Sequence, residues 1–123
     1  MCGFVGVISP ALPVRDDLLS AMRDRLIHRG PDNGANWVRP GKRIALAHRR
    51  LSIIDTTHAA DQPMLSDDGL CCIAFNGEIY NWRELRAELE QVGKAPVWRG
   101  HSDTEVLLAG IAAWGLPDTL RRA

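Results

Sequence analysis

The sequence feature that most constrains the fold is a pair of segments with complete helix signatures, residues 81–93 and 102–115. In each, a residue able to cap a helix is followed three positions later by glutamate, and a glycine comes at the end. Apolar residues recur between these ends at helical spacing. The capping and closing residues are Asn81, Glu84 and Gly93 in the first segment, and Ser102 or Asp103, Glu105 and Gly115 in the second. The sequence therefore predicts two helices here.

Shorter apolar runs predict strands in the rest of the chain. A third helix is predicted over residues 14–30, where apolar residues recur at helical spacing until a Gly-Pro pair. Turn chemistry dominates residues 29–37, and Asp68-Gly69 predicts a hairpin turn. The predicted strands are residues 2–9, 43–50, 51–55 and 70–80, the last running into a loop. This mixture predicts an α/β pattern with antiparallel hairpins.

The charge balance and the cysteine content exclude several classes of protein. Fifteen basic residues balance fifteen acidic ones, which argues against nucleic-acid and membrane-surface proteins, because both rely on a basic field. No run approaches the ~20 apolar residues that a membrane helix needs, and the first residues do not form a signal peptide. The three cysteines lack zinc-type spacing, so no metal site is predicted. Their odd number suggests a reducing compartment, and we expect a cytoplasmic protein.

Cys2 has a specific chemical use at its position. If Met1 is removed, Cys2 carries both a thiol and a free α-amine, whose unperturbed pKa of ~7.7–8.0 suits a general base at neutral pH. Nucleophile and base then share one residue, and no histidine partner is needed. On position alone, the alternative of a small buried residue near the chain end is favoured.

Asn76 and Gly77 follow an apolar run and leave a side-chain amide and a backbone N–H able to converge. Two such donors can form an oxyanion hole. The alternative is a plain Asn-Gly turn, which is common between strands.

Arginine and aspartate residues supply candidate ligands for a small charged substrate. Arg49 and Arg50 precede a predicted strand, and arginine grips carboxylates with two hydrogen bonds. Since neighbouring strand residues point to opposite faces, at most one of the two can face a given site. Asp103, at a helix start, could hold an ammonium group or merely cap the helix.

The order of five motifs is more specific than any one of them. They are "MCG" at 1–3, "HRGPD" at 28–32, "LAHRRLSIID" at 46–55, "FNGEIYN" at 75–81 and "GHSDTEV" at 100–106. Together they resemble the glutaminase domain of class II glutamine amidotransferases, and within these the asparagine synthetase (glutamine-hydrolysing) family. The resemblance spans nearly the whole chain, so residues 1–123 are interpreted as a partial domain of this type.

The resemblance implies an α+β fold of the N-terminal nucleophile hydrolase type, an αββα sandwich of mainly antiparallel sheets, here truncated. It implies that Cys2 attacks glutamine and that ammonia is released for transfer to aspartate. The remaining site residues implied are Asn76 and Gly77 as the oxyanion hole, Arg50 for the α-carboxylate, Asp103 for the α-ammonium, and Leu51, Ile53 and Glu78 as further glutamine contacts.

The chain also departs from the family pattern. No Gly/Ser-rich pyrophosphate loop occurs, so the synthetase domain is taken as absent, and ATP and magnesium are expected only together with it. The expected partners are L-glutamine and either a second copy of the chain or the synthetase region. Two alternatives stay open: a truncated domain that binds glutamine with weak or no turnover, and an amidotransferase with another acceptor, such as a sugar carboxylate in surface-polysaccharide synthesis.

Overall fold

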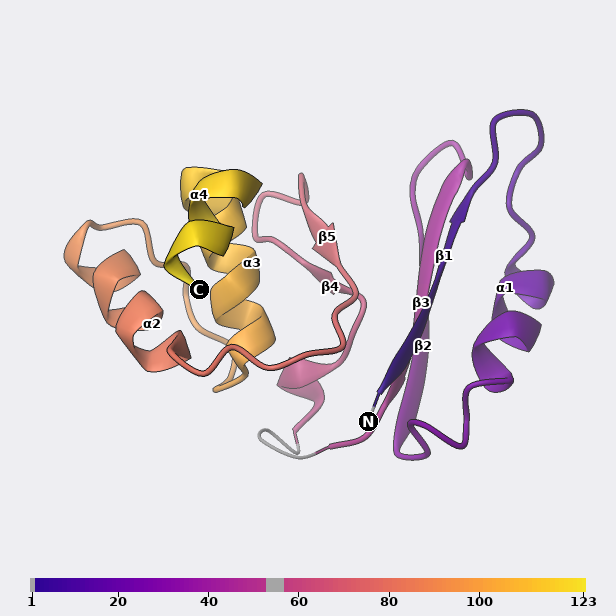
Figure 1. Ribbon diagram of the computed structural model, residues 1–123. Helices are drawn as coiled ribbons and strands as arrows, with labels where there is room; N and C mark the ends of the chain where they lie inside the picture. Colours follow the sequence, from indigo (N-terminus) through magenta and orange to yellow (C-terminus); the bar gives the residue numbers. More distant parts are fainter. Residues whose placement is uncertain (1, 53–56) are drawn as a thin grey trace. The chain divides into compact units, whose positions relative to one another are not determined.

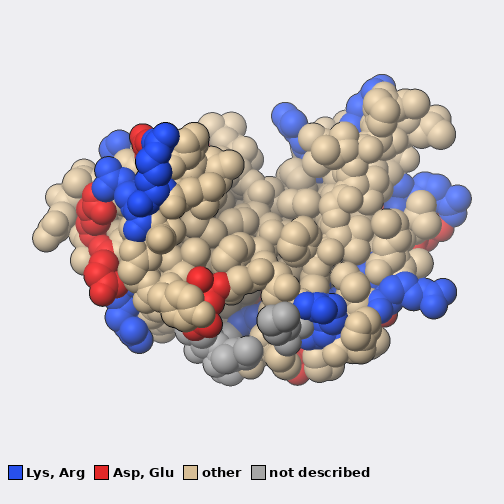
Figure 2. Space-filling view, in the orientation of Figure 1, with Lys and Arg blue, Asp and Glu red and all other residues tan. Residues whose placement is uncertain are grey.

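The structure, a computed structural model, describes residues 2–52 and 57–123. The chain divides into two compact units (Figure 1). Residues 1–53, 61–63 and 74–76 form the first unit, and residues 54–60, 64–73 and 77–123 form the second. Charged side chains of both signs are spread over the face seen in Figure 2, in keeping with the balanced composition.

The first unit is an antiparallel sheet with one helix against it. The strands β1 (Gly3–Ile8), β2 (Asn33–Val38) and β3 (Ile44–Arg50) lie in the order β1-β3-β2. Helix α1 (Asp16–Asp24) runs along one face of the sheet (Figure 1). Leu19, Ala45 and Ala47 are fully buried between them, with Val5, Val7, Val14 and Val38 packed around.

The second unit is mainly helical. Helices α2 (Trp82–Gln91) and α3 (Asp103–Trp114) pack together, and a short α4 (Leu116–Arg122) follows α3 and packs against it. A 3-10 turn, η1 (His58–Ala60), and a hairpin of β4 (Met64–Leu65) and β5 (Cys72–Ile73) complete it. The core contains Leu85, Leu89, Val106 and Ala109, surrounded by half-buried residues that include Trp82, Trp98 and Trp114.

The α+β class and the antiparallel sheets are confirmed, as are both C-terminal helices. Ser102 caps α3 as predicted, since its Oγ accepts the Glu105 N–H at 3.2 Å. The Asn81 cap is wrong: its side-chain amide instead donates to the carbonyl oxygen of Arg122 at 2.7 Å. Helix α4 was not predicted, although a proline in its first turn and arginines in its last are helix signals.

The segment predicted as turns over residues 29–37 contains β2, so that prediction is wrong. Its sequence, NGANWV, lacks clear alternation, yet the segment pairs with β3 over its whole length as an edge strand of the sheet. The helix predicted over 14–30 ends at Asp24, and residues 25–29 continue as turns, with Arg29 N–H donating to the Leu26 carbonyl at 2.9 Å. These turns bring Arg29 back to the start of β1.

The remaining strand predictions have mixed outcomes. Residues 2–9 and 43–50 contain β1 and β3, whereas the strand expected over 70–80 is limited to Cys72–Ile73. The Asp68-Gly69 turn is confirmed, because the Gly69 N–H donates to the carbonyl oxygen of Ser66, three residues earlier, at 2.9 Å. In the strand predicted over 51–55, residues 51 and 52 have no strand structure, and the rest lies outside the described residues. Among the helices of the described segments, none has the length and apolar character to cross a membrane.

Candidate active site

Cys2 stands immediately before β1, and its thiol is held against the backbone that follows β3. The Leu51 N–H donates to Sγ at 3.3 Å, and Sγ lies 3.6 Å from the Leu51 carbonyl oxygen. The register explains this contact: Gly3 is paired with Arg49, so the antiparallel strands bring residue 2 beside residues 50 and 51. An N–H thus faces the sulfur, the atom on which negative charge develops when a thiol reacts as a nucleophile.

The "HRGPD" segment, to which sequence reasoning gave no separate role, fixes this end of the sheet. Arg29 Nε donates to the carbonyl oxygen of Cys2 at 3.1 Å, so the backbone of the cysteine is held as well as its thiol. Asp32 accepts the Ser52 N–H at 2.7 Å. A contact between residues 27 positions apart leaves no periodic pattern in the sequence. The motif itself was therefore the only sequence signal for this role of Arg29.

Gly30 is required by a close approach of two backbones. A Cβ at this position would lie 2.4 Å from the carbonyl carbon and oxygen of Arg49, well inside the closest contacts that proteins show. Arg49 in turn donates to the carbonyl oxygens of Gly30 and Pro31 at 2.7 and 3.1 Å. The turn and β3 are therefore locked together next to Cys2.

The prediction that Arg49 and Arg50 serve different faces is confirmed. While Arg49 binds the turn, Arg50 forms a largely buried ion pair with Asp61, with Nη1 and Oδ1 2.7 Å apart. Of the predicted site residues, Cys2 and Leu51 are in contact, and the β1–β3 register places the backbone of Arg50 beside that of Cys2. Ile53 lies outside the described residues.

Asn76 belongs to the same unit as these three, whereas Gly77, Glu78 and Asp103 belong to the second unit. Residues 76–78 are exposed. Asp103 is 6% exposed, and its Oδ2 accepts the Ile79 N–H at 2.8 Å. Asp103 is therefore not the cap of α3, a role that Ser102 fills; it ties the loop after Gly77 to the start of that helix.

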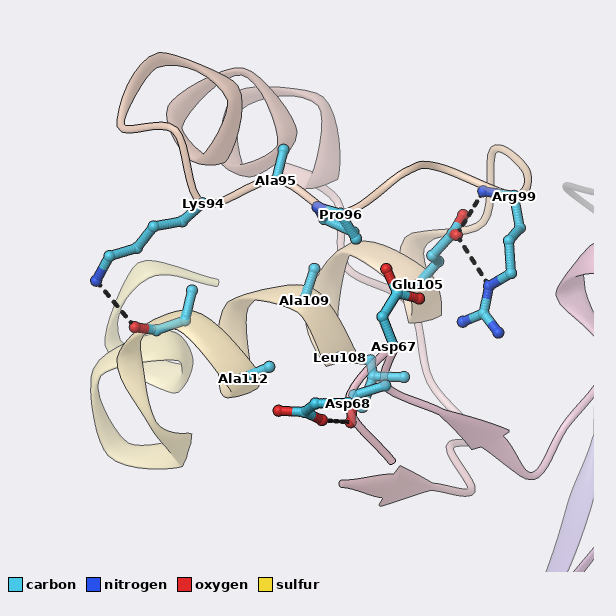
Figure 3. A pocket seen from close by; sticks show the side chains of 12 residues that line it. Asp67, Asp68, Lys94, Ala95, Pro96, Arg99, Glu105, Leu108, Ala109 and Ala112 are labelled. Atoms are coloured by element: carbon cyan, nitrogen blue, oxygen red, sulfur yellow. Dashed lines mark hydrogen bonds and ion pairs between the residues drawn. The ribbon is translucent and has the colours of Figure 1, made fainter. Parts of the chain in front are cut away.

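A cavity of about 400 Å³ lies within the second unit, and none of the predicted site residues lines it (Figure 3). Glu105, only 3% exposed, accepts the backbone N–H groups of Arg99 and Gly100 at 2.7 and 3.1 Å on its edge. Four alanines also line the cavity, and three of them, Ala109, Ala112 and Ala113, lie on α3 like Glu105. The described ranges contain no cluster of three histidine, cysteine or acidic side chains able to hold a metal ion.

The other two cysteines differ from Cys2 in their surroundings. Cys71 and Cys72 lie at the start of β5 in the second unit, and neither forms a disulfide. Burial raises the pKa of the Cys72 thiol to about 11, so Cys72 is protonated at neutral pH and a poor nucleophile.

Comparison with known proteins agrees with the motif analysis. A family model described as "Glutamine amidotransferase domain" matches residues 1–123. Asparagine synthetase (glutamine-hydrolyzing) 1 of Bacillus subtilis is 43% identical over 113 residues, an alignment that covers 89% of this chain and 17% of that protein. The asparagine synthetase (glutamine-hydrolyzing) of Zea mays is 39% identical over 112 residues, covering 87% of this chain and 17% of the relative.

A relative with a different name also matches. Amidase chry2 of Gibberella zeae is 34% identical over 98 residues, which is 80% of this chain and 14% of that protein. The chain thus spans less than a fifth of the length of these relatives.

Proposed function

The chain belongs to the glutamine amidotransferase domain family, and from that membership we propose that it hydrolyses the side-chain amide of glutamine with Cys2 as the nucleophile. The observation that carries the proposal is the placement of Cys2. Its thiol is in contact with the Leu51 N–H and its carbonyl is held by Arg29. A nucleophile must be held still, and both ends of this residue are tied to the sheet.

The proposed reaction needs Met1 to be removed. The free α-amine of Cys2 takes the thiol proton while sulfur attacks the side-chain carbonyl carbon of glutamine. A C–S bond forms and the carbonyl electrons move to oxygen. The proton then passes to the amide nitrogen, the C–N bond breaks and ammonia leaves. Water hydrolyses the resulting γ-glutamyl thioester, which releases glutamate and restores the thiol.

We propose that Asn76 and the Gly77 N–H stabilise the oxyanion of this intermediate. Both residues are exposed in the structure, as residues that contact a substrate must be. Donors aimed at a developing oxyanion are worth ~3–4 kcal/mol each in known hydrolases.

For substrate binding, we propose that Arg50 holds the α-carboxylate of glutamine and that Asp103 holds its α-ammonium, with Leu51, Ile53 and Glu78 as further contacts. A zwitterion needs one fixed cation and one fixed anion. The ion pair with Asp61 fixes the Arg50 guanidinium in one orientation, and an arginine with five N–H donors can bind a second carboxylate.

We propose aspartate as the acceptor of the ammonia, since two of the relatives are named asparagine synthetases. ATP and magnesium would serve that transfer in a synthetase region, not in residues 1–123. A further copy of the chain or that region is the proposed protein partner, and the cytoplasm is the proposed compartment.

One relative, amidase chry2, is not named an asparagine synthetase, and we keep a second candidate, in which the same glutaminase supplies a different acceptor, such as a sugar carboxylate. Isotopically labelled glutamine separates the two candidates, because the label would appear in asparagine or in a sugar amide.

Glutamate release from glutamine tests the proposed hydrolysis. We expect the Cys2→Ala variant to lose all measurable activity while the matched Cys71→Ala variant keeps it. The latter removes a half-buried thiol from the second unit. Hydrolysis that persists in Cys2→Ala would overturn the mechanism, and glutamine binding without any release by the wild type would favour a binding domain.

A further inference from the structure

The segment that carries Asn76 lies outside both sheets, so strand pairing does not set its position. Residues 74–76 follow β5 without regular structure. Two side chains of the first unit hold the peptide groups of Phe75 instead. Gln62 Oε1 accepts the Phe75 N–H at 2.6 Å, and His48 Nε2 lies 3.3 Å from the Phe75 carbonyl oxygen.

The contact fixes the tautomer of His48. A carbonyl oxygen can only accept, so Nε2 carries the proton and donates to Phe75. His48 is completely buried in β3, and its Nδ1 has no hydrogen-bond partner among the described residues. A buried nitrogen without a partner destabilises the fold, and an apolar side chain would avoid this cost. We take the histidine at this position to serve the hydrogen bond that its Nε2–H donates to the Phe75 carbonyl oxygen.

Burial lowers the pKa of His48, and the nearby Arg50 charge acts in the same direction. The bond to Phe75 and the Asp61 carboxylate act in the opposite direction but do not outweigh burial. The ring is therefore neutral at neutral pH, with the single N–H that the Phe75 carbonyl accepts.

The same region connects two groups with proposed roles in binding. Arg50 stands two residues after His48 on β3 and pairs with Asp61, and the next residue, Gln62, binds Phe75. Arg50, the proposed carboxylate ligand, and Phe75, the residue before Asn76, are thus bound by two consecutive residues, Asp61 and Gln62.

We propose that His48 and Gln62 are positioning residues that hold the two peptide groups on either side of Phe75, and with them the Asn76 amide, where an oxyanion forms. The catalytic role of this anchor rests on the proposed glutaminase activity. The contacts of His48 and Gln62 with Phe75 do not. The sequence did not indicate either residue, because their contacts with Phe75 span 27 and 13 residues and leave no local pattern.

Kinetics test the consequence with His48→Met, Gln62→Met and His48→Gln. The methionine variants keep bulk but lose the bond, and we expect kcat to fall by roughly 10- to 100-fold, part of the loss seen when an oxyanion donor is removed. KM for glutamine should change little. His48→Gln can place an N–H near the Nε2 position and should recover most of the activity. The double methionine variant should lose less than the product of the single losses, since both side chains act on the backbone of one residue, Phe75.

Amide hydrogen exchange tests the anchoring without any assumption about catalysis. We expect the Phe75 N–H to exchange faster in Gln62→Met than in the wild type, with the amides of β1 and β3 unchanged. Val38→Ala is the matched control: it removes apolar contact on the α1 side of the sheet, so it should lower thermal stability without a selective effect on kcat or Phe75 exchange.

Wild-type kcat in both methionine variants, a loss confined to KM, or unchanged Phe75 exchange would overturn the inference. So would a His48→Gln variant no better than His48→Met. Failure of the proposed function gives a different pattern, with no difference between the wild type and Cys2→Ala in glutamate release, and the exchange result still decides whether the anchor exists. Alkylation of Cys2 by iodoacetamide, which needs no oxyanion hole, should proceed at the wild-type rate in all four variants.

Discussion

The hydrogen bonds inside the first unit differ in kind from those inside the second. In the second unit, the helices follow local signals, such as the Ser102 cap on an N–H three residues away. In the first, the end of the sheet beside Cys2 depends on contacts between distant segments: Leu51 reaches Cys2 over 49 residues and Arg29 over 27. The proposed nucleophile is therefore positioned by long-range hydrogen bonds. The second unit also has such bonds, for example between Asn81 and Arg122, but its helix ends carry local signals in addition.

The largest expected effect compares two tight glycines, one in each unit. Gly30→Ala would place a Cβ 2.4 Å from the Arg49 backbone, whereas Gly110→Ala would place one 2.8 Å from a methyl group of the Thr119 side chain. Backbone cannot yield as a side chain can, and alanine also favours the helix that contains Gly110 by about 1 kcal/mol. We expect Gly30→Ala to lower the free energy of unfolding by more than about 2 kcal/mol, measured by urea denaturation, and Gly110→Ala by much less. Equal losses would contradict the close approach at Gly30.

The next effect compares two arginines that each donate to a backbone carbonyl. Arg29 binds Cys2 O at 3.1 Å in the first unit, and Arg86 binds Gly100 O at 3.2 Å in the second. We expect Arg29→Ala to reduce glutamate release by roughly 10- to 100-fold, because a displaced nucleophile attacks poorly. Arg86→Ala should affect stability alone, which thermal melting would report. An Arg29→Ala variant with full activity would show that its contact with Cys2 has no role.

A smaller effect concerns pH and arises in the first unit. The pKa of His48 is lowered from its ordinary value of 6.5 in the folded state, so below about pH 6.5 the unfolded state binds more protons than the folded state. The contribution of the neutral His48 ring to the free energy of unfolding is fully present above about pH 6.5. It is lost as the pH falls from 6.5 toward the pKa of His48 in the folded state. We expect the melting temperature to fall less between pH 7.5 and pH 5.5 in His48→Gln than in the wild type. Parallel curves would show that His48 does not titrate differently in the two states.

The smallest effect lies in the second unit and compares two predicted caps. Ser102→Ala should cost about 1 kcal/mol, the usual value for a lost N-cap, by chemical denaturation. Asn81→Ala removes a hydrogen bond to the exposed Arg122 carbonyl instead and should cost less. A larger loss at Asn81 would contradict this order.

The sequence predicted most where structure depends on nearby residues. Both C-terminal helices and the strands at 2–9 and 43–50 were recovered, because spacing, caps and glycines are local signals. Strand β2 was missed, since its polar residues are stabilised by pairing with β3 and not by an apolar pattern of their own.

The candidate site was predictable in part. Cys2, Arg50 and Leu51 were predicted from motifs; the structure shows Cys2 in contact with Leu51, and the strand register places the Arg50 backbone beside them. The supporting residues were not predicted: Arg29 holds Cys2 across 27 residues, and His48 acts through a buried N–H on a distant peptide. Such roles depend on which segments meet, information that the local pattern does not contain.

The central claim is that Cys2, freed from Met1, is the nucleophile, and a diazoketone analogue of glutamine tests it most directly. The analogue alkylates a reacting thiol, and mass spectrometry of the digested protein locates the adduct. We predict one adduct, on an N-terminal peptide that begins at Cys2, formed more slowly in the presence of glutamine. Cys72, whose pKa is raised to about 11, should stay unlabelled. An adduct on Cys71 or Cys72, or labelling of a peptide that retains Met1, would contradict the account.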